Sequence, residues 1–456
     1  MGVSTTNKQY DDLKKRWQKI ADAMAGGQAV KSAGERYLSR LAGQTAEQYE
    51  KYKDRALFFN VVRRVHKAMS SLAFRRPAQV SGNLLGVPLS DNAEIAYGDD
   101  TLDAVARTCF KQVLSYGRAG LLVDAPNGEY ASDDAEPYLV PYDANAIINW
   151  RYSDAPDGRE LALVVLWEAL EVPSESDPYT SETKNAYRVL EMRDGAYWQS
   201  YYLDTGQEIA LQWEISPTVS GAQLPYIPFF IIGSESNTFD EQSIPLEDLA
   251  DLAISDYRTS ADLENGRHWV GIPQPFMAGF SNDIQQWQIG GDKIWQSAEP
   301  SARVGFLEFT GGGLSSLETA VKEKEEKMIV LGMKLLDPSS GGAEKPEAIR
   351  LKLVGETAIL QDISRLVSDG VTAALQELDR WGGLSSENEL PVYAISADVS
   401  LAGVDVAVLQ FLQGLWRDGG ISYETLYYNI EKAGATRDGV SATMELETVS
   451  ANEPKL

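Results

Sequence analysis

The feature that most constrains the fold is the stretch 314–383, which predicts a helix, a short polar loop and a long helix. Ser315 and Glu318 have the spacing of a capping box, so the first helix is expected to begin there and to end at the Asp-Pro pair 337–338. A first helical turn tolerates proline, so the second helix is expected over 346–381. At about 1.5 Å per residue that helix would span roughly 50 Å. A helix of this length needs neighbours that cover its apolar stripe.

Apolar residues recur along both helices of this stretch. In the first helix a seven-residue repeat lies within a dense mosaic of charges, a pattern typical of helices packed side by side. The repeat consists of Leu314, Val321, Met328 and Leu335. In the second helix, Gly355 and Gly370 are interior weak points where a bend is expected. Its stripe consists of Ile349, Leu353, Ile359, Leu360, Ile363, Val367, Val371, Leu375, Leu378 and Trp381.

Length and charge restrict the class of protein. The 456 residues are enough for two to four domains. No run of about 18 apolar residues occurs, which predicts no membrane-spanning helix. The polar start lacks the apolar core of a signal peptide, which predicts that the chain is not secreted. The net charge of −26 disfavours tight DNA binding but is compatible with DNA that slides past the protein.

Motifs for catalysis are missing from the sequence. The one cysteine, Cys109, excludes an internal disulfide and is predicted to be a small buried hydrophobe in a helix. A nucleophilic cysteine would need a nearby histidine, and His66 and His268 lie in unrelated segments. Zinc-ligand spacing, a Gly-x-Ser-x-Gly elbow and a P-loop are absent. We therefore predict that the protein is not an enzyme and uses no cofactor or metal.

The N-terminal region contains the most basic part of the chain. Helices are predicted over 8–26 and 47–72, the latter with a stripe formed by Leu57, Val61, Val65 and Met69. Its basic side chains could form a nucleic-acid patch, a solvated face, or a face that docks on the acidic face of a neighbouring copy. The third interpretation suits the charge balance best. The candidate interface residues are Lys51, Arg55, Arg63, Arg64, Arg75 and Arg76.

The middle of the chain predicts an α+β fold with a mainly antiparallel sheet. A helix is expected over 100–117, and strands over 121–124, 138–142, 147–152, 161–170, 187–192, 196–203, 207–214 and 227–232. The run 161–170 is almost continuously apolar, which favours an interior strand. The turn Arg193-Asp194-Gly195 predicts a hairpin. Many Tyr and Trp residues could suggest a carbohydrate platform, but strand propensity and core packing explain them more simply.

An acidic helix is expected over 243–266, and Gly266 would end it. A compact segment is expected to follow over 267–314, with strands at 275–278 and 304–309. The acidic residues of this helix are expected outside its apolar face; they are Glu247, Asp248, Asp251, Asp256 and Asp262. The glycine run 311–313 could cradle a phosphate, but it fits a tight turn better because its spacing matches no nucleotide-binding motif. The remaining elements are expected to be a strand at 391–396 and helices at 404–415, 422–432 and 440–452.

Several local sequences stand in a fixed order along the chain. They are YKDRALFFN at 52–60, FRRP at 74–77, IPLEDLA at 244–250, WVGIP at 269–273, GFLEFTG at 305–311 and GISYET at 420–425. None is a catalytic signature. In their joint order they resemble tailed-bacteriophage portal proteins, the head–tail connectors, over nearly the whole chain.

The resemblance implies a portal-type α+β architecture. Its parts would be an N-terminal helical segment at 1–29, a wing at 30–242, a first stem helix at 243–266, a clip at 267–314, a second stem helix at 315–336, a tunnel loop at 337–345, a long bent helix with a return to the wing at 346–397, and a helical crown at 398–456. It also implies a non-enzymatic ring of about twelve subunits. That ring would form the channel through which the genome is packaged and ejected.

The implied partners follow from that role. They are further copies of the chain, double-stranded DNA bound without sequence specificity, the terminase packaging motor, the head–tail adaptor, and the major capsid and scaffolding proteins, with no membrane partner. The implied location is the unique capsid vertex of the virion, after assembly in the host bacterial cytoplasm. Cyclic rings use heterologous interfaces, and a basic segment on an acidic chain would suit one.

Carried over to this sequence, the resemblance implies two sets of site residues. The tunnel loop facing DNA would comprise Asp337, Ser339, Ser340, Gly341, Gly342, Glu344 and Lys345, with Lys345 its one cation. The stem set would comprise Asp248, Asp251, Tyr257, Lys322, Glu325 and Met328. The alternative function is an acidic polysaccharide hydrolase or another aromatic-rich binding module, suggested by 10 Trp and 21 Tyr. It predicts a deep cleft lined by two carboxylates and aromatic residues.

Overall fold

The computed structural model describes most of the chain and divides it into two compact units. The described residues are 2–98, 100–126, 136–155, 158–174, 177, 179–219, 221–272, 274–279, 300–307, 311–334, 346–382, 390–396, 406–432, 436 and 442–451. Unit 1 comprises residues 1–17, 65–246 and 333–456, and unit 2 comprises residues 18–64 and 247–332.

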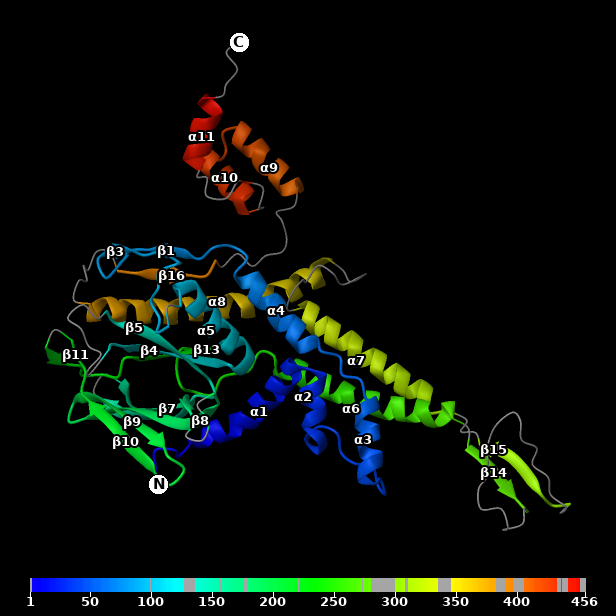
Figure 1. The fold of residues 1–456 in the computed structure, drawn as a ribbon. Helices are drawn as coiled ribbons and strands as arrows, with labels where there is room; N and C mark the ends of the chain where they lie inside the picture. The colour runs from blue at the N-terminus through cyan, green and yellow to red at the C-terminus, as the bar shows by residue number, and fades with distance from the viewer. Residues whose placement is uncertain are drawn as a thin grey trace. The chain divides into compact units, whose positions relative to one another are not determined.

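Two antiparallel sheets form the centre of unit 1 (Figure 1). The first has the order β13-β4-β5, with β4 at Arg118–Asp124, β5 at Tyr138–Asp143 and β13 at Phe229–Gly233. The second has the order β10-β9-β8-β7-β6, formed by β6 (Ile147–Ala155), β7 (Gly158–Pro173), β8 (Ser181–Arg193), β9 (Ala196–Asp204) and β10 (Ile209–Ile215). The predicted α+β class and antiparallel pairing are confirmed, and β7 is an interior strand as its apolar run indicates.

Local chemistry explains the hairpin between β8 and β9. Asp194 and Gly195 have φ values of 51° and 80°, the left-handed pair that a two-residue turn of type I′ requires. Three smaller antiparallel pairs complete the strands of unit 1. They are β1 (Gln79–Ser81) with β16 (Val392–Ala394), β2 (Asn83–Leu84) with β3 (Val87–Pro88), and β11 (Thr218–Val219) with β12 (Ala222–Gln223).

Helices α5 (Leu102–Tyr116) and α8 (Pro346–Trp381) pack on the three-stranded sheet (Figure 1). Thr101 caps α5, because its Oγ1 accepts from the Ala104 N–H at 3.3 Å. Cys109 on α5 is buried, as predicted. Helix α8 has the predicted bounds, and the buried part of its stripe consists of Leu360, Ile363, Val367, Val371, Leu375 and Leu378.

One member of the predicted α8 stripe needs correction, and Gly370 has a packing role besides the expected bend. Ile359 is 43% exposed, so it does not belong to the buried stripe. Gly370 is a close-packing position, because a Cβ there would come within 2.5 Å of the Ile232 Cγ1 on β13. The missing side chain lets the helix approach the sheet, which is a reason for glycine independent of any bend. The side chains at 349, 353 and 355 lie outside the described residues.

Unit 2 is mainly helical. Its elements are the C-terminal part of α1 (Lys8–Ala25), α2 (Gly27–Ser32), a 3-10 turn (Gly34–Arg36), α3 (Ala46–Arg55), the first turn of α4 (Val61–Ala73), α6 (Glu247–Gly271), the hairpin of β14 (Gln274–Ala278) and β15 (Arg303–Leu307), and α7 (Leu314–Lys334). One hydrophobic cluster joins α2, α3 and α6, and it is formed by Val30, Tyr37, Leu38, Tyr49, Tyr52, Ala56, Ile254, Tyr257 and Ala261.

The single helix predicted over 47–72 is wrong, since α3 and α4 are separate helices. Ala56 leaves the helical conformation at φ −59° and ψ 138°. The Asn60 Oδ1 then accepts from the Arg63 N–H at 3.3 Å, which satisfies a donor at the start of α4. Leu57 falls in the break and is 64% exposed, whereas Val61, Val65 and Met69 are buried as predicted.

The boundaries of α6 and α7 also differ from expectation. Helix α6 runs past Gly266, which lies inside the helix, and a Cβ there would come within 2.6 Å of the Leu314 Cδ2. Helix α7 begins at Leu314, ahead of the predicted capping box, and the Glu318 carboxylate pairs with Arg267 at 2.9 Å. Glu318 therefore contacts α6 instead of forming the predicted capping box.

The C-terminal helices form a small group of their own. They are α9 (Val406–Arg417), α10 (Tyr423–Lys432) and α11 (Ala442–Ala451), and α10 contacts both of the others. These three helices lie where the sequence predicts them. Among the residues that the structure describes, no helix is long and apolar enough to cross a membrane.

Candidate functional site on the paired helices α6 and α7

Helices α6 and α7 form an antiparallel pair within unit 2. The Lys324 Nζ donates to the Ser255 carbonyl at 2.9 Å and to the Thr259 Oγ1 at 2.5 Å. Further along α6, Arg267 pairs with Glu318 on the earlier part of α7 at 2.9 Å. Since residue numbers rise on one helix as they fall on the other, the two helices run in opposite directions. The β14–β15 hairpin lies between them in sequence.

Helix α6 is buried on more than one face. Tyr257 and Ile254 belong to the hydrophobic cluster of unit 2, whereas Asp256 and Ser260 are also buried. Hydrogen bonds hold α6 to the N-terminal segments. The Tyr52 hydroxyl donates to the Asp262 Oδ1 at 2.6 Å, the Arg258 Nε donates to the Tyr37 carbonyl at 2.6 Å, and the Leu57 N–H donates to the Ser260 Oγ at 3.2 Å.

A pocket of about 300 Å³ lies along this pair. The segment that connects α3 to α4 supplies two apolar side chains, and α6 and α7 supply the others. The lining residues are Leu57, Phe59, Asp256, Ser260, Leu263, Glu264, Arg267, Glu318, Val321, Lys322 and Glu325. The pocket therefore combines an apolar wall with several carboxylates.

Asp256 is the most unusual group in this pocket. Its side chain is 2% exposed, and its Oδ1 has no hydrogen-bond partner among the described residues. The pKa of Asp256 is raised to about 6, chiefly by burial and in addition by the charge of Glu325, while the charge of Lys324 opposes the rise. Burial lowers the pKa of the Lys324 ammonium in turn. A buried carboxyl with an open acceptor is the feature most able to recognise a ligand here.

The structure places the predicted stem residues in different environments. Tyr257 and Met328 are 1% and 0% exposed and serve the core, and Glu325 lines the pocket. Asp248 is exposed, Asp251 pairs with Lys19, and Lys322 lies 3.9 Å from Glu326. The structure therefore does not bring these six residues together on one surface.

The sequence predicted that Asp256 lies on the solvated acidic face of α6, and this prediction is wrong because Asp256 is buried. The sequence analysis did not single out Ser260, Arg267 or Lys324. The signal that could have revealed them is the small-residue content of α6. Ala250, Ala253, Ser260 and Ala261 indicate close approach on several sides.

The predicted basic residues do not share one helix face, because α3 and α4 are separate. Lys51 pairs with Glu47 at 2.6 Å, and the Arg55 Nη2 lies 3.0 Å from the His268 Nε2. The Arg64 guanidinium lies 5.6 Å from the centre of the Phe59 ring. Arg63 and Arg75 are exposed and Arg76 is half-buried. Lys51, Arg55, Arg63 and Arg64 belong to unit 2, and the other two belong to unit 1.

The tunnel-loop residues lie outside the described residues. The gap from 335 to 345 includes Asp337, Ser339, Ser340, Gly341, Gly342, Glu344 and Lys345. Their assignment stays a prediction.

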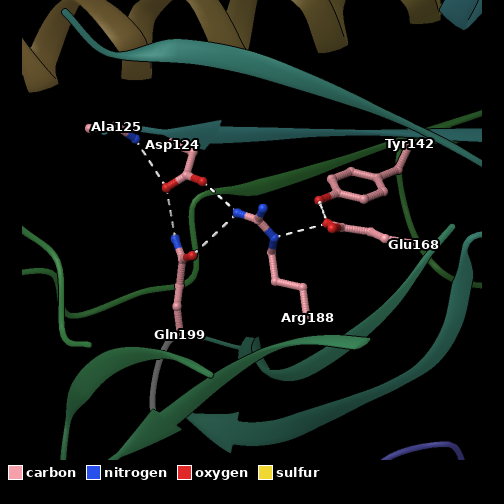
Figure 2. A network of polar contacts seen from close by, with 6 residues as sticks. All are labelled: Asp124, Ala125, Tyr142, Glu168, Arg188 and Gln199. Atoms are coloured by element: carbon pink, nitrogen blue, oxygen red, sulfur yellow. Dashed lines mark hydrogen bonds and ion pairs between the residues drawn. The ribbon is translucent and has the colours of Figure 1, made fainter. Parts of the chain in front are cut away.

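A second polar cluster lies in unit 1 (Figure 2). The Arg188 guanidinium on β8 lies 2.5 Å from the Asp124 Oδ2 on β4 and 3.0 Å from the Glu168 Oε1 on β7. The Tyr142 hydroxyl donates to the Glu168 Oε1 at 2.6 Å, and the Gln199 Nε2 donates to the Asp124 Oδ1 at 3.0 Å. These residues come from both sheets, so the network fastens one sheet to the other.

The network gives little support to the hydrolase alternative. Burial alone would lower the pKa of Arg188, but Tyr142, Glu168 and Asp124 raise it well above its ordinary value. The charged guanidinium pairs with both carboxylates, which is the arrangement of a structural ion-pair network. Arg188 also lies 5.9 Å from the ring centres of Tyr201 and Trp213, which stack on each other, so these two rings pack within the network.

No group of three or more His, Cys, Asp or Glu side chains within the described part of the chain could hold a metal ion. Burial raises the pKa of Cys109 to about 12, which is the behaviour of a structural cysteine.

Comparison with known proteins gives one family match and several structural likenesses. The model of a family described as a domain of unknown function, DUF4055, matches residues 245–382. That range spans α6, the β14–β15 hairpin, α7 and α8, which is less than half of the chain. No curated protein matches.

Two solved structures show a distant likeness. One is a chain from the neck of an empty GTA particle computed with C6 symmetry, with 10% identity and a TM-score of 0.39, covering 83% of this chain and 90% of that chain. The other is a chain from the virion of a native gene transfer agent (GTA) particle, with 11% identity and a TM-score of 0.39, covering 89% of this chain and 99% of that chain.

Proposed function

We propose that the chain is a non-enzymatic structural subunit of a tailed-phage-like particle, and that it forms a portal ring at the capsid vertex. The observation that carries this proposal is the antiparallel pair α6 and α7 with a small β-hairpin inserted between them, followed by a helix of 36 residues. The sequence resemblance to portal proteins assigns the same order to stem, clip and long helix. The channel of the ring would pass double-stranded DNA during packaging and ejection.

Exposed apolar side chains on unit 2 support an assembled state. Trp269 and Ile272 at the end of α6 are 41% and 55% exposed, and Ile329 and Val330 on α7 are 44% and 48% exposed. Apolar surface of this kind often marks an interface. In a ring, one face of each subunit meets a different face of the next, so these residues are candidates for contact between copies.

The β14–β15 hairpin is the candidate docking element for other particle proteins. Phe276 on β14 is 43% exposed, and Val304 and Phe306 on β15 are 44% and 56% exposed. We assign the head–tail adaptor and the terminase packaging motor to this hairpin. We assign the major capsid and scaffolding proteins to other surfaces of the ring.

Electron microscopy of the purified full-length chain tests the proposal. Ring-shaped particles of about twelve subunits are expected, and light scattering should report the corresponding mass. The double variant Ile329→Asp with Val330→Asp should reduce the ring fraction, whereas Glu326→Gln, at a charged position on the same helix, should not. A strictly monomeric protein over a wide concentration range would refute the ring.

The loop cation gives a narrower prediction. Lys345 is the one basic residue among positions 337–345, so it is the residue there best suited to contact phosphate. Lys345→Ala should reduce DNA packaging or retention in a complementation assay and leave ring assembly intact. Glu344→Gln is the matched control, since it alters the neighbouring charge without removing the cation. Unchanged packaging by Lys345→Ala would remove the assigned role.

A further inference from the structure

The pocket along α6 and α7 contains a buried acceptor that the protein itself does not satisfy. The Asp256 Oδ1 has no partner among the described residues, although the side chain is 2% exposed. Buried polar groups are nearly always hydrogen-bonded, and an orphaned carboxylate oxygen is costly. Asp256 lines the pocket, so a donor that enters the pocket can reach this part of α6.

The cations in and beside the pocket already have partners other than Asp256 and Glu325. Arg267 pairs with Glu264 at 2.8 Å and with Glu318 at 2.9 Å. The Lys324 ammonium donates to the Ser255 carbonyl and to the Thr259 Oγ1. Lys322 is 78% exposed at its side chain and extends toward solvent near Glu326. The carboxylates of Asp256 and Glu325 therefore leave the inner pocket with an excess of negative charge.

The rest of the pocket suits an alkyl chain. Leu57, Phe59, Leu263 and Val321 provide an apolar wall. The volume of about 300 Å³ is at the lower end of the range for small-ligand pockets, which run from about 300 to 1,000 Å³. A small ligand with one charged end and a short apolar stem would satisfy both parts of this lining.

We propose that this pocket binds an alkylammonium group, with the ammonium toward Asp256 and Glu325 and the methylenes against Leu263 and Val321. The group could belong to a free diamine or to a lysine side chain of a second copy of the chain. Both sources present the same chemistry to the pocket. The ammonium would supply the donor that the Asp256 Oδ1 lacks.

Protonation should control this binding. Asp256 accepts a cation best when it is ionised, and burial raises its pKa to about 6. The other titratable groups at the site are Glu264, Glu318, Glu325, Arg267, Lys322 and Lys324. Affinity for an alkylammonium should therefore be high at pH 8 and fall several-fold at pH 5.

Calorimetric titration of the full-length protein with 1,4-diaminobutane tests the proposal. Saturable binding is expected at pH 8, with at least a tenfold loss in Asp256→Asn and a clear loss in Glu325→Gln. Glu326→Gln is the matched control, because this carboxylate is 63% exposed on the same helix, and it should change affinity less than twofold. Circular dichroism shows whether each variant folds. If Asp256→Asn does not fold, Glu325→Gln still tests the proposal.

Carbodiimide coupling distinguishes the two sources. With diaminobutane present, a mass increase on Asp256 or Glu325 identifies the free diamine as a ligand. In a mixture of isotopically labelled and unlabelled chains without diamine, a crosslink from either carboxylate to a lysine of the other chain identifies a second copy. Absence of saturable binding together with absence of both products would overturn the proposal.

Discussion

The Arg188 network in unit 1 and the Asp256 carboxyl in unit 2 differ in how their buried charges are satisfied. In unit 1, Arg188 reaches two carboxylates, and both carboxylates receive further hydrogen bonds from Tyr142 and Gln199. In unit 2, the carboxyl of Asp256 is equally buried, but one of its oxygens has no partner among the described residues. A buried network in which every group has a hydrogen-bond partner rigidifies a fold, whereas a buried polar group without a partner lowers the stability of the fold.

Arg118 is a second buried charge of unit 1, and its Nη1 and Nη2 have no hydrogen-bond partner among the described residues. Its side chain is 2% exposed, and its guanidinium lies 5.4 Å from the Trp17 ring centre and 4.8 Å from the Trp150 ring centre. Burial lowers the pKa of Arg118 to about 10, which leaves it charged at neutral pH. Aromatic faces attract a cation, so they partly replace the carboxylates that Arg188 has. Asp256 differs from Arg118 in what surrounds it, because the charge of Glu325 raises the pKa of Asp256, whereas two aromatic rings face Arg118.

Removal of the Arg188 guanidinium should have the largest effect on stability. Arg188→Met would leave Asp124 and Glu168 buried without their cation, and breaking such a pair costs about 3–5 kcal/mol. Urea unfolding monitored by tryptophan fluorescence should show the loss as a lower midpoint. Arg193→Met on the same strand is the control, because Arg193 is 37% exposed at its side chain and its pairs should contribute about 1 kcal/mol or less.

Equal losses of unfolding free energy in Arg188→Met and Arg193→Met would contradict the stabilising role of the Arg188 network. They would mean that the network in Figure 2 contributes no more than an ordinary surface ion pair. If Arg188→Met leaves the free energy of unfolding almost unchanged, the network does not fasten the two sheets.

Neutralising Asp256 should have a smaller effect of the opposite sign. The folded state raises the pKa of this acid from 3.8 to about 6, so the folded state binds the proton more tightly than the unfolded state does. Stability should therefore fall as pH rises from about 4 to about 6, by an amount on the order of 3 kcal/mol, since each pKa unit is worth about 1.4 kcal/mol. Asp256→Asn should gain about 2 kcal/mol at pH 8 and lose this pH dependence.

Hydrogen exchange of the α6 amides between pH 5 and pH 8, corrected for the intrinsic exchange rate, measures this effect within unit 2. The wild-type protein should show lower protection at pH 8, and Asp256→Asn should show no such difference. The experiment must be done without amines, because a bound alkylammonium would stabilise the ionised carboxyl. Identical pH profiles for the two proteins would show that Asp256 is not the destabilising group.

Local sequence signals explain most of what could be predicted. Helix α8 has a proline at its start and a pair of glycines at its end, so its bounds follow from backbone chemistry alone. The β8–β9 hairpin follows from Asp194-Gly195, whose left-handed conformation these residue types favour. Alternation and apolar runs then indicate the neighbouring strands. These features need no knowledge of distant contacts.

Features that depend on distant partners could not be predicted in the same way. The break between α3 and α4 occurs where Leu57 donates to Ser260 on α6, more than 200 positions away. The burial of Asp256 depends on α7, and the network of Arg188 needs strands from both sheets. The candidate pocket is built from such contacts, so the sequence indicated the helices that carry it but not the pocket.

The smallest expected effects are those of alanine at a closely packed glycine on α8 in unit 1 and on α6 in unit 2. Gly370→Ala on α8 would gain about 1 kcal/mol of helix propensity, but its Cβ would press on the fully buried Ile232, and overpacking costs about 1–3 kcal/mol. A net loss of about 1 kcal/mol is expected. Gly266→Ala on α6 meets only the end of the half-buried Leu314, which can rotate away, so its net change should be near zero or slightly stabilising. Thermal unfolding of both variants measures the difference.

Gly414→Ala calibrates this comparison. A Cβ at Gly414 on α9 would meet no heavy atom within 4 Å, so the variant should show the propensity gain alone, about 0.5–1 kcal/mol. If Gly370→Ala stabilises the protein as much as Gly414→Ala does, then α8 is not packed tightly on β13. If Gly266→Ala instead costs as much as Gly370→Ala, then the α6–α7 pair is as rigid as the core of unit 1.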